Sequence, residues 1–272
     1  MGKCYCIRYG GGGKLSLWYT NNNYILVLSK TFHINFLNEL RVRENTSVNN
    51  PRIIMKDEHG RWYVEEKVDG FTLPQKSFGH IHLLAFYELF KLYEENKTKK
   101  VKFNWLIDNI KEKLKMINID KHEIFNLLNN MELNKYLVTI VHGDFIDSNI
   151  IYNAKYNKYT ILDWEYTGYK SICHDIFNYF TIKTFITGKN YNNMFLNGKN
   201  DYLNELKFKF LNIFNIDHDE LRLYELIYYL ERINLEIIKY KCGILKSKIK
   251  LRGNCLTWVN LLWNTLKSLE KY

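Results

Sequence analysis

The stretch VTIVHGDFIDSNIIY, residues 138–152, encloses a group of polar residues between two β-branched runs. The polar residues are His142, Gly143, Asp144, Asp147, Ser148 and Asn149. Gly, Asp, Ser and Asn often form turns between strands for purely local backbone reasons. The stretch therefore predicts either a simple turn or a loop that carries chemistry, and the rest of the chain decides between the two.

A second strand pattern, KYTILDW at 158–164, follows this loop and contains Asp163 near its end. A hairpin of residues 149–153 with this strand would bring Asn149 and Asp163 to the same side, where their oxygens face one cation. Such hard oxygen ligands suit Mg²⁺, which proteins hold with one or two carboxylates plus substrate phosphates. Asp144 would then stand beside the metal and accept a proton from an attacking hydroxyl. These are the parts that phosphoryl transfer requires.

The chain changes character after its first quarter. Strand patterns occur at 4–9, 14–19, 24–29, 52–55 and 61–66, with one helical pattern at 34–44. From residue 78 onward, apolar residues recur at spacings of three and four, which indicates amphipathic helices. We therefore predict an N-terminal β-rich lobe, residues 1–68, and a helical lobe, residues 69–272, with residues 65–75 as the connector.

Composition excludes several classes of protein. The 272 residues are 46% hydrophobic and 16% aromatic, enough for a sizeable core. Five scattered cysteines suggest neither a disulfide framework nor a zinc site, and no apolar run approaches the roughly 18 residues of a membrane span. We expect a cytoplasmic protein without a transmembrane segment.

The net charge of +10 has two interpretations. It could serve an anionic partner, or it could reflect a lysine-rich composition with dispersed charges. No nucleic-acid-binding motif and no clustered arginine accompany it, so we expect no nucleic-acid partner. The sequence does not predict the oligomeric state.

Three segments resemble the motifs of one known family. HGDFIDSNIIY (142–152), ILDWEYTG (161–168) and HDIFN (174–178) are similar in order and spacing to the aminoglycoside phosphotransferase and choline kinase family. This family is a branch of the protein-kinase-like fold. The resemblance covers nearly the whole chain, although the last third matches only as generic helices. It implies an α+β fold with a small β-rich N-terminal lobe and a larger helical C-terminal lobe, and ATP and Mg²⁺ as cofactors.

The resemblance also assigns roles to the loop. Asp144 is the expected catalytic base, His142 a scaffold residue of the loop, and Asn149 and Asp163 the expected Mg²⁺ ligands. Asp175 matches the family residue that anchors the backbone of the catalytic loop, although its position also suits a helix N-cap.

Three neighbouring residues have plainer interpretations. We expect Asp147 to be a solvated loop residue, Trp164 to pack in the interior, and Glu165 to lie at the surface.

The nucleotide side of the resemblance rests on the N-terminal lobe. The candidate phosphate-covering loop consists of Gly10, Gly11, Gly12 and Gly13. Backbone N–H groups in such a loop can approach phosphate because no Cβ intervenes, although four glycines would equally form a flexible hairpin. Glu39 matches the helix glutamate that pairs with a strand cation, with an exposed helical glutamate as the alternative. The backbone from Glu66 to Val68 matches the hinge that meets adenine.

The strand cation itself departs from the family pattern. Relatives carry Lys or Arg in the third strand, at the position occupied here by Val27. Lys30 lies three residues further on, which places it on the opposite face of a regular strand, so a bulge or a shifted register would be needed to use it. Lys14 is a weaker substitute.

The sequence thus predicts an ATP-dependent phosphotransferase that acts on a hydroxyl of a small molecule. A sugar, an amino alcohol such as choline, or a glycan-linked hydroxyl are the candidate acceptors, and the +10 charge argues against polycationic aminoglycosides. The substitution at position 27 leaves open an inactive relative that acts as a nucleotide-binding or scaffold protein. A nucleic-acid-binding protein is the third alternative.

Overall fold

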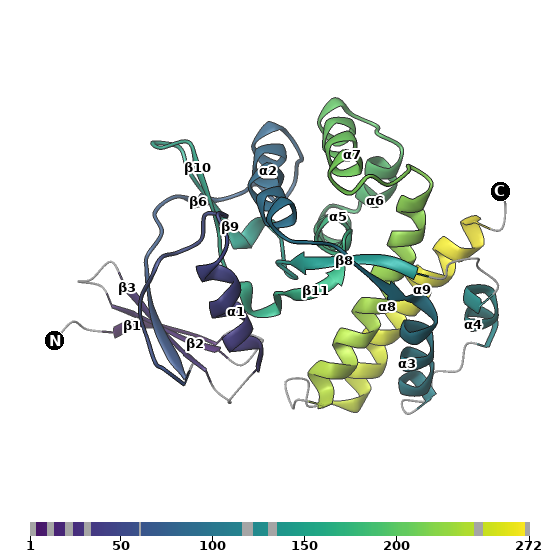
Figure 1. The fold of residues 1–272 in the computed structure, drawn as a ribbon, viewed down its shortest axis with the longest axis horizontal. Coiled ribbons are helices and arrows are strands. Elements are labelled where there is room, and N and C mark those ends of the chain that lie inside the picture. The colour runs from purple at the N-terminus through teal and green to yellow at the C-terminus, as the bar shows by residue number, and fades with distance from the viewer. Residues whose placement is uncertain are drawn as a thin grey trace. The chain divides into compact units, whose positions relative to one another are not determined.

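The computed structural model describes residues 4–9, 14–19, 24–29, 34–59, 61–115, 122–129, 135–241 and 247–269 (Figure 1). The chain divides into two compact units. The first comprises Met1–Lys97, Ile140–Tyr169 and Asn178–Asn215, and the second comprises Thr98–Thr139, Lys170–Phe177 and Ile216–Tyr272. The lobe boundary between residues 68 and 69 stays a prediction.

The first unit begins with an antiparallel five-stranded sheet in the order β1-β2-β3-β5-β4. The strands are β1 (Cys4–Tyr9), β2 (Lys14–Tyr19), β3 (Tyr24–Ser29), β4 (Ile53–Lys56) and β5 (Trp62–Glu66), and helix α1 (Ile34–Glu44) follows β3. Neighbouring strands in the sequence pair as hairpins, as their short polar breaks predict. The predicted β-rich beginning with a single helix is confirmed.

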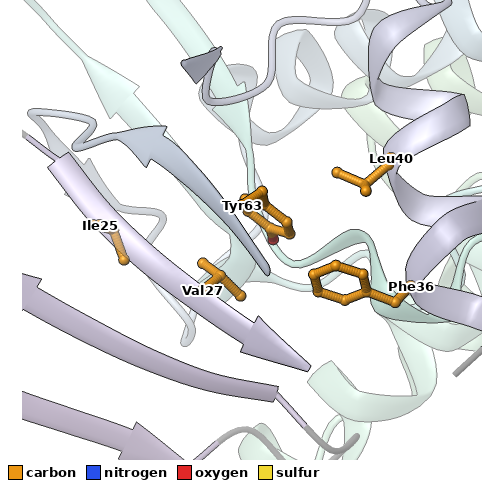
Figure 2. Close-up of a cluster of buried hydrophobic side chains, with 5 residues drawn as sticks. All are labelled: Ile25, Val27, Phe36, Leu40 and Tyr63. Atoms are coloured by element: carbon orange, nitrogen blue, oxygen red, sulfur yellow. The ribbon is translucent and has the colours of Figure 1, made fainter. Parts of the chain in front are cut away.

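A small apolar cluster holds α1 against this sheet. Ile25 and Val27 of β3 and Tyr63 of β5 pack with Phe36 and Leu40 of α1, and all five are buried (Figure 2). Val27 and Tyr63 are paired across the two strands, so their side chains share one face of the sheet. The ring of Phe36 lies 5.1 Å from that of Tyr63, centroid to centroid.

The rest of the first unit combines a three-stranded sheet with helices. Strands β6 (Phe71–Thr72), β9 (Ile150–Asn153) and β10 (Lys158–Ile161) pair in the order β10-β9-β6. The helices are α2 (His80–Glu95), α6 (Tyr191–Leu196), α7 (Asp201–Phe214) and most of α5 (His174–Thr187). Phe86 of α2 lies at the centre of an aromatic core with Phe145 and Phe180, at ring-centroid distances of 4.9 and 5.9 Å. Phe145 directly follows Asp144, so this core supports the polar loop from within.

The second unit is mainly helical. It contains β7 (Lys99–Lys102), α3 (Phe103–Lys115), α4 (His122–Asn129), α8 (Glu220–Lys241) and α9 (Lys248–Leu269), with most of β8 (Lys135–Val141) and the end of β11 (Gly168–Ser171). Tyr224, Tyr228, Tyr229 and Trp258 are buried in its core. These aromatic side chains therefore fill the interior of the unit instead of lining an open site.

The described helices include none that is both long enough and apolar enough to cross a membrane.

Candidate active site

The polar loop is folded by its own hydrogen bonds. Residues Asp147–Asn149 form a single 3₁₀ turn, closed by the bond from the backbone N–H of Asn149 to the carbonyl of Ile146 (2.9 Å). The side-chain amide of Asn149 donates to the backbone oxygen of Asp144 (2.9 Å) and to its carboxylate Oδ2 (3.1 Å). Both bonds use the amide nitrogen, so the amide oxygen of Asn149 takes no part in them and suits a metal. The predicted base and the first predicted metal ligand are thus in direct contact.

His142 links this loop to the strand that precedes Asp163. Its Nδ1 accepts from the backbone N–H of Asp144 (3.2 Å), so Nε2 carries the proton and donates to the carbonyl of Leu162 (2.8 Å). The imidazole is fully buried and lies edge-to-face on Trp164, with ring centroids 4.8 Å apart. This geometry fits the predicted scaffold role, and the buried Trp164 confirms the expected packing of that residue.

Asp163 stands at the end of the predicted hairpin. Ile150 pairs with Ile161, and the N–H of Leu162 donates to the carbonyl of Asn149 (2.8 Å), so the two strands meet beside both predicted metal ligands. The predicted hairpin is confirmed. Asp163 itself is exposed and has φ +59°, a left-handed conformation that Asp tolerates better than most residues.

The phenol of Tyr166 lies close to the carboxylates of the candidate site. Burial raises the pKa of its phenol, and the neighbouring carboxylates of Glu165, Asp144 and Asp163 raise that pKa further. Glu165 is buried, so its expected surface position is wrong. Tyr166 is not one of the predicted site residues, although it directly follows the Asp-Trp-Glu motif.

This donor set fits a hard divalent cation. Asp163 supplies a carboxylate and Asn149 an amide oxygen, and the clustered carboxylates gain from a positive charge. The described part of the chain contains no group of three or more His, Cys, Asp or Glu arranged to hold a metal. A cation at this position would therefore take its remaining ligands from phosphate and water, as is usual for Mg²⁺.

Asp147 is buried, whereas the sequence predicted a solvated loop residue. Its carboxylate is 7% exposed and accepts from Lys183 of α5 (Nζ to Oδ2, 2.7 Å) and from the hydroxyl of Tyr179. His82 of α2 lies 3.7 Å away (Nε2 to Oδ1). Burial lowers the pKa of the Lys183 ammonium, while the attraction of Asp147 opposes that shift. Asp147 is therefore a buried ionic anchor of the turn that carries Asn149, and its assignment as a solvated loop residue is wrong.

A small pocket lies beside this ionic anchor. Its volume is about 30 Å³, and it is partly open to solvent. It is lined by Gln75, Ile146, Asp147, Ser148, Tyr179, Ile182, Lys183 and Ile186. Ser148 lines the pocket and immediately precedes Asn149 in the sequence, whereas Asp144, Asn149 and Asp163 do not line it.

The predicted nucleotide residues are described only in part. Gly10 to Gly13 and Lys30 lie outside the described residues. Glu39 is fully buried, which rules out the exposed alternative, and its Oε1 accepts from the hydroxyl of Tyr63 (2.9 Å) and from Arg43 Nη1 (3.4 Å).

The predicted hinge runs from β5 in the five-stranded sheet to β6 in a separate three-stranded sheet. Glu66 ends β5, and its backbone N–H donates to the carbonyl of Arg52 (3.0 Å). Val68 is half-buried in the segment that leads to β6.

Asp175 lies at the start of α5, in the second unit. Helix α5 begins at His174, so Asp175 occupies its first turn instead of the N-cap. The side chain is fully buried. A carboxylate in a first turn is favoured by the helix dipole, and the loop-anchoring role stays a prediction.

Comparison with known proteins decides the family. The model of the choline/ethanolamine kinase family matches residues 72–223, which is more than half of the chain. The chain belongs to the choline/ethanolamine kinase family. The match includes the polar loop, the Asp163 segment and the start of α5, so the family prediction made from those motifs is confirmed. A search of curated sequences found no match.

Solved structures agree with this family. A choline kinase from Streptococcus pneumoniae is 14% identical with a TM-score of 0.62, over 98% of this chain and 95% of that one. A choline/ethanolamine kinase family protein from Mesorhizobium loti is 15% identical with a TM-score of 0.60, over 98% and 93%. Aminoglycoside phosphotransferase APH(4)-Ia is 12% identical with a TM-score of 0.54, over 94% and 92%. The likeness confirms the predicted α+β, protein-kinase-like two-lobed fold, in a family of small-molecule kinases.

Proposed function

We propose that this choline/ethanolamine kinase family member transfers the γ-phosphate of ATP to a hydroxyl group of a small molecule. One observation carries the proposal: the amide of Asn149 bonds to Asp144, and the imidazole of His142 joins the Asp144 backbone to the residue before Asp163. A plain turn between two strands has no need of this arrangement, whereas phosphoryl transfer needs a base and metal ligands held at fixed separations.

Each residue has a chemical role in this proposal. Asp144 orients the acceptor hydroxyl and takes its proton. Asn149 and Asp163 hold Mg²⁺, which neutralises phosphate charge when it is bound. His142 is a positioning residue, because both of its ring nitrogens are occupied by backbone groups.

The acceptor is the less defined part of the proposal. The net charge of +10 disfavours a polycationic acceptor, since like charges repel on approach. Choline binding uses an aromatic cage, for which α8 and α9 offer five aromatic side chains. Four of them, Tyr224, Tyr228, Tyr229 and Trp258, are buried in the core, and Trp263 is half-buried. A sugar, a glycan-linked hydroxyl or a small amino alcohol bound elsewhere are the acceptors to test.

One observation favours a second candidate function, an inactive nucleotide-binding relative. Val27 occupies the strand position at which the family resemblance requires a cation, and it is 2% exposed. An inactive relative would bind ATP without turning it over, or would not bind it.

The test combines nucleotide binding with turnover. We would measure MgATP binding by calorimetry, and ADP release with choline, ethanolamine and a panel of sugars. Asp144→Asn should keep MgATP binding and lose turnover by about 10²–10⁴-fold, because the general base is removed. Asp163→Asn should lose Mg²⁺-dependent binding.

The control is Asp219→Asn, which changes a fully exposed carboxylate just before α8. It should leave both measurements unchanged. Binding of MgATP without turnover of any acceptor, and with Asp144→Asn indistinguishable from wild type, would favour the inactive relative.

A further inference from the structure

The 3₁₀ turn Asp147–Asn149 is attached to the rest of its unit through Asp147. The backbone carbonyl of Asp147 accepts from the N–H of Leu73 (3.3 Å), which directly follows β6. Its carboxylate accepts from Lys183 and from the hydroxyl of Tyr179, both on α5. Asp147 therefore joins the turn to the segment after β6 through its backbone and to α5 through its side chain.

The ammonium group of Lys183 is fully used at this junction. Its Nζ donates to Asp147 Oδ2 (2.7 Å), to the hydroxyl of Tyr179 (3.2 Å) and to the carbonyl of Pro74 (3.4 Å). An ammonium group has three N–H donors, so these contacts occupy all of them. The side chain is 1% exposed. Lys183 is therefore a link between three parts of the first unit and does not offer its charge to a ligand.

Helix α2 reaches the same junction through His82. Its Nδ1 accepts from the backbone N–H of Gly79 (3.1 Å), so Nε2 carries the proton and donates to the carbonyl of Pro74 (3.0 Å). The carbonyl of Pro74 thus accepts from α2 and from α5. The turn is held from two helices and from the chain segment between β6 and α2.

Stability alone is a poor explanation of this ion pair. The cost of removing two charges from water offsets much of their attraction, and a buried ion pair often contributes no more stability than well-packed apolar residues. The pair does provide direction, because a charged hydrogen bond of 2.7 Å specifies where the carboxylate of Asp147 can lie. Asn149 lies two residues further on in the same turn, and its amide nitrogen is bonded to Asp144. A displaced turn would therefore move the amide oxygen of Asn149.

We infer that Lys183 and Tyr179 are positioning residues for the metal site, because through Asp147 they fix the turn that presents the amide oxygen of Asn149. This inference rests on the proposed kinase function. Neither residue touches the cation or the nucleotide in this role. They act on the affinity for the metal through the position of one predicted ligand, as outer partners of metal ligands commonly do.

The test measures how much Mg²⁺ contributes to nucleotide binding. Calorimetry would give the affinity for MgATP and, in EDTA, the affinity for metal-free ATP, and the ratio of the two affinities is the readout. Lys183→Met should lower this ratio about 10-fold, at the lower end of the usual effect of outer partners on metal affinity. It should leave the affinity for metal-free ATP unchanged. Tyr179→Phe removes only the hydroxyl that donates to Asp147 and should lower the ratio to a smaller extent.

Two further variants serve as references. Asp163→Asn removes a predicted metal ligand and should abolish the contribution of Mg²⁺. Thr181→Val is the matched control, because Thr181 is a buried residue of α5 whose hydroxyl accepts from Asn192 of α6 (2.9 Å). It should leave the ratio unchanged. Circular dichroism at the assay temperature would establish that each variant is folded, and Tyr179→Phe decides the test if Lys183→Met is not.

Other results would overturn the inference. They are an unchanged ratio in either folded α5 variant, an equal loss of affinity for MgATP and for metal-free ATP, or the same change of ratio in Thr181→Val. A wild type that binds MgATP no more tightly than metal-free ATP would overturn it together with the proposed metal site. A wild type with the expected Mg²⁺ contribution, and with an unchanged ratio in Lys183→Met and Tyr179→Phe, would refute the positioning role alone.

Discussion

Lys183 and Asp147 form a buried ion pair, so substitutions of the two residues should have strongly non-additive effects on the free energy of unfolding. The side chains are 1% and 7% exposed, and Nζ lies 2.7 Å from Oδ2. At that distance, and at an effective dielectric constant of about 20, the attraction is about 6 kcal/mol before the cost of removing both charges from water. Loss of one partner leaves the other buried and uncompensated, which typically costs about 3–5 kcal/mol.

A double-mutant cycle measures this coupling. Lys183→Met and Asp147→Asn should each lower the free energy of unfolding by about 3 kcal/mol, and the double variant should lose little more than either single variant. Urea unfolding followed by circular dichroism gives the four values. The matched control is the exposed pair of Lys56 with Glu44, 46% and 38% exposed, for which the coupling should stay below about 1 kcal/mol.

His82 adds a pH dependence to the same variant. Burial and the nearby Lys183 ammonium lower the pKa of this imidazole. Without Lys183, the imidazole can take up a proton beside Asp147. The loss in free energy of unfolding caused by Lys183→Met should therefore become smaller as the pH falls from about 8 to about 6. Additive single effects in the cycle, together with a deficit that does not change with pH, would refute the view that Asp147 is held by a buried charge.

Two further predictions concern a buried carboxyl and a glycine. Burial raises the pKa of Glu231 to about 7 against an ordinary 4.5, although its bonds from Ser171 act in the opposite direction. The raised value means that the folded state binds this proton more tightly. The resulting stabilisation is complete below pH 4.5 and is lost as the pH rises through 7. From about pH 4.5 to about pH 8, the free energy of urea unfolding of wild type should therefore fall by up to about 3 kcal/mol relative to that of Glu231→Gln. The same pH dependence of this free energy in both proteins would contradict the prediction. Gly70 has φ +145°, and a Cβ there would lie 2.5 Å from the carbonyl oxygen of Tyr152. Gly70→Ala should cost about 2–4 kcal/mol in thermal or urea unfolding, whereas Gly79→Ala, with open space around it, should cost less than about 1 kcal/mol. Equal effects of the two substitutions would show that this strand junction tolerates a side chain.

The sequence was most informative where structure is local. Strand alternation and short polar breaks predicted β1, β2 and β3 and the hairpin of β9 with β10, because hairpin partners are separated by only a few residues. The contact between Asp144 and Asn149 spans five residues and was accessible for the same reason. The motif that they form was distinctive enough to predict the family and the kinase-like fold.

The sequence was least informative where a partner is distant in the chain. Asp147 resembles any polar turn residue until Lys183, 36 positions later, is placed beside it. Glu165 was assigned to the surface because a carboxylate is usually solvated, but it is buried and hydrogen-bonds to the phenol of Tyr166. In both cases tertiary packing overrode a sound expectation about an isolated residue type.

Position 27 shows that the framework of this sheet and helix does not require a cation in β3. The cluster of Val27, Tyr63 and Phe36 keeps α1 on the sheet, and Arg43 fixes the end of that helix to Glu65. Neither contact depends on a cation in β3, so loss of that cation need not disturb the fold. The substitution that suggests an inactive protein thus removes no contact on which this part of the fold depends, and MgATP turnover by the wild type distinguishes an inactive relative from an active one.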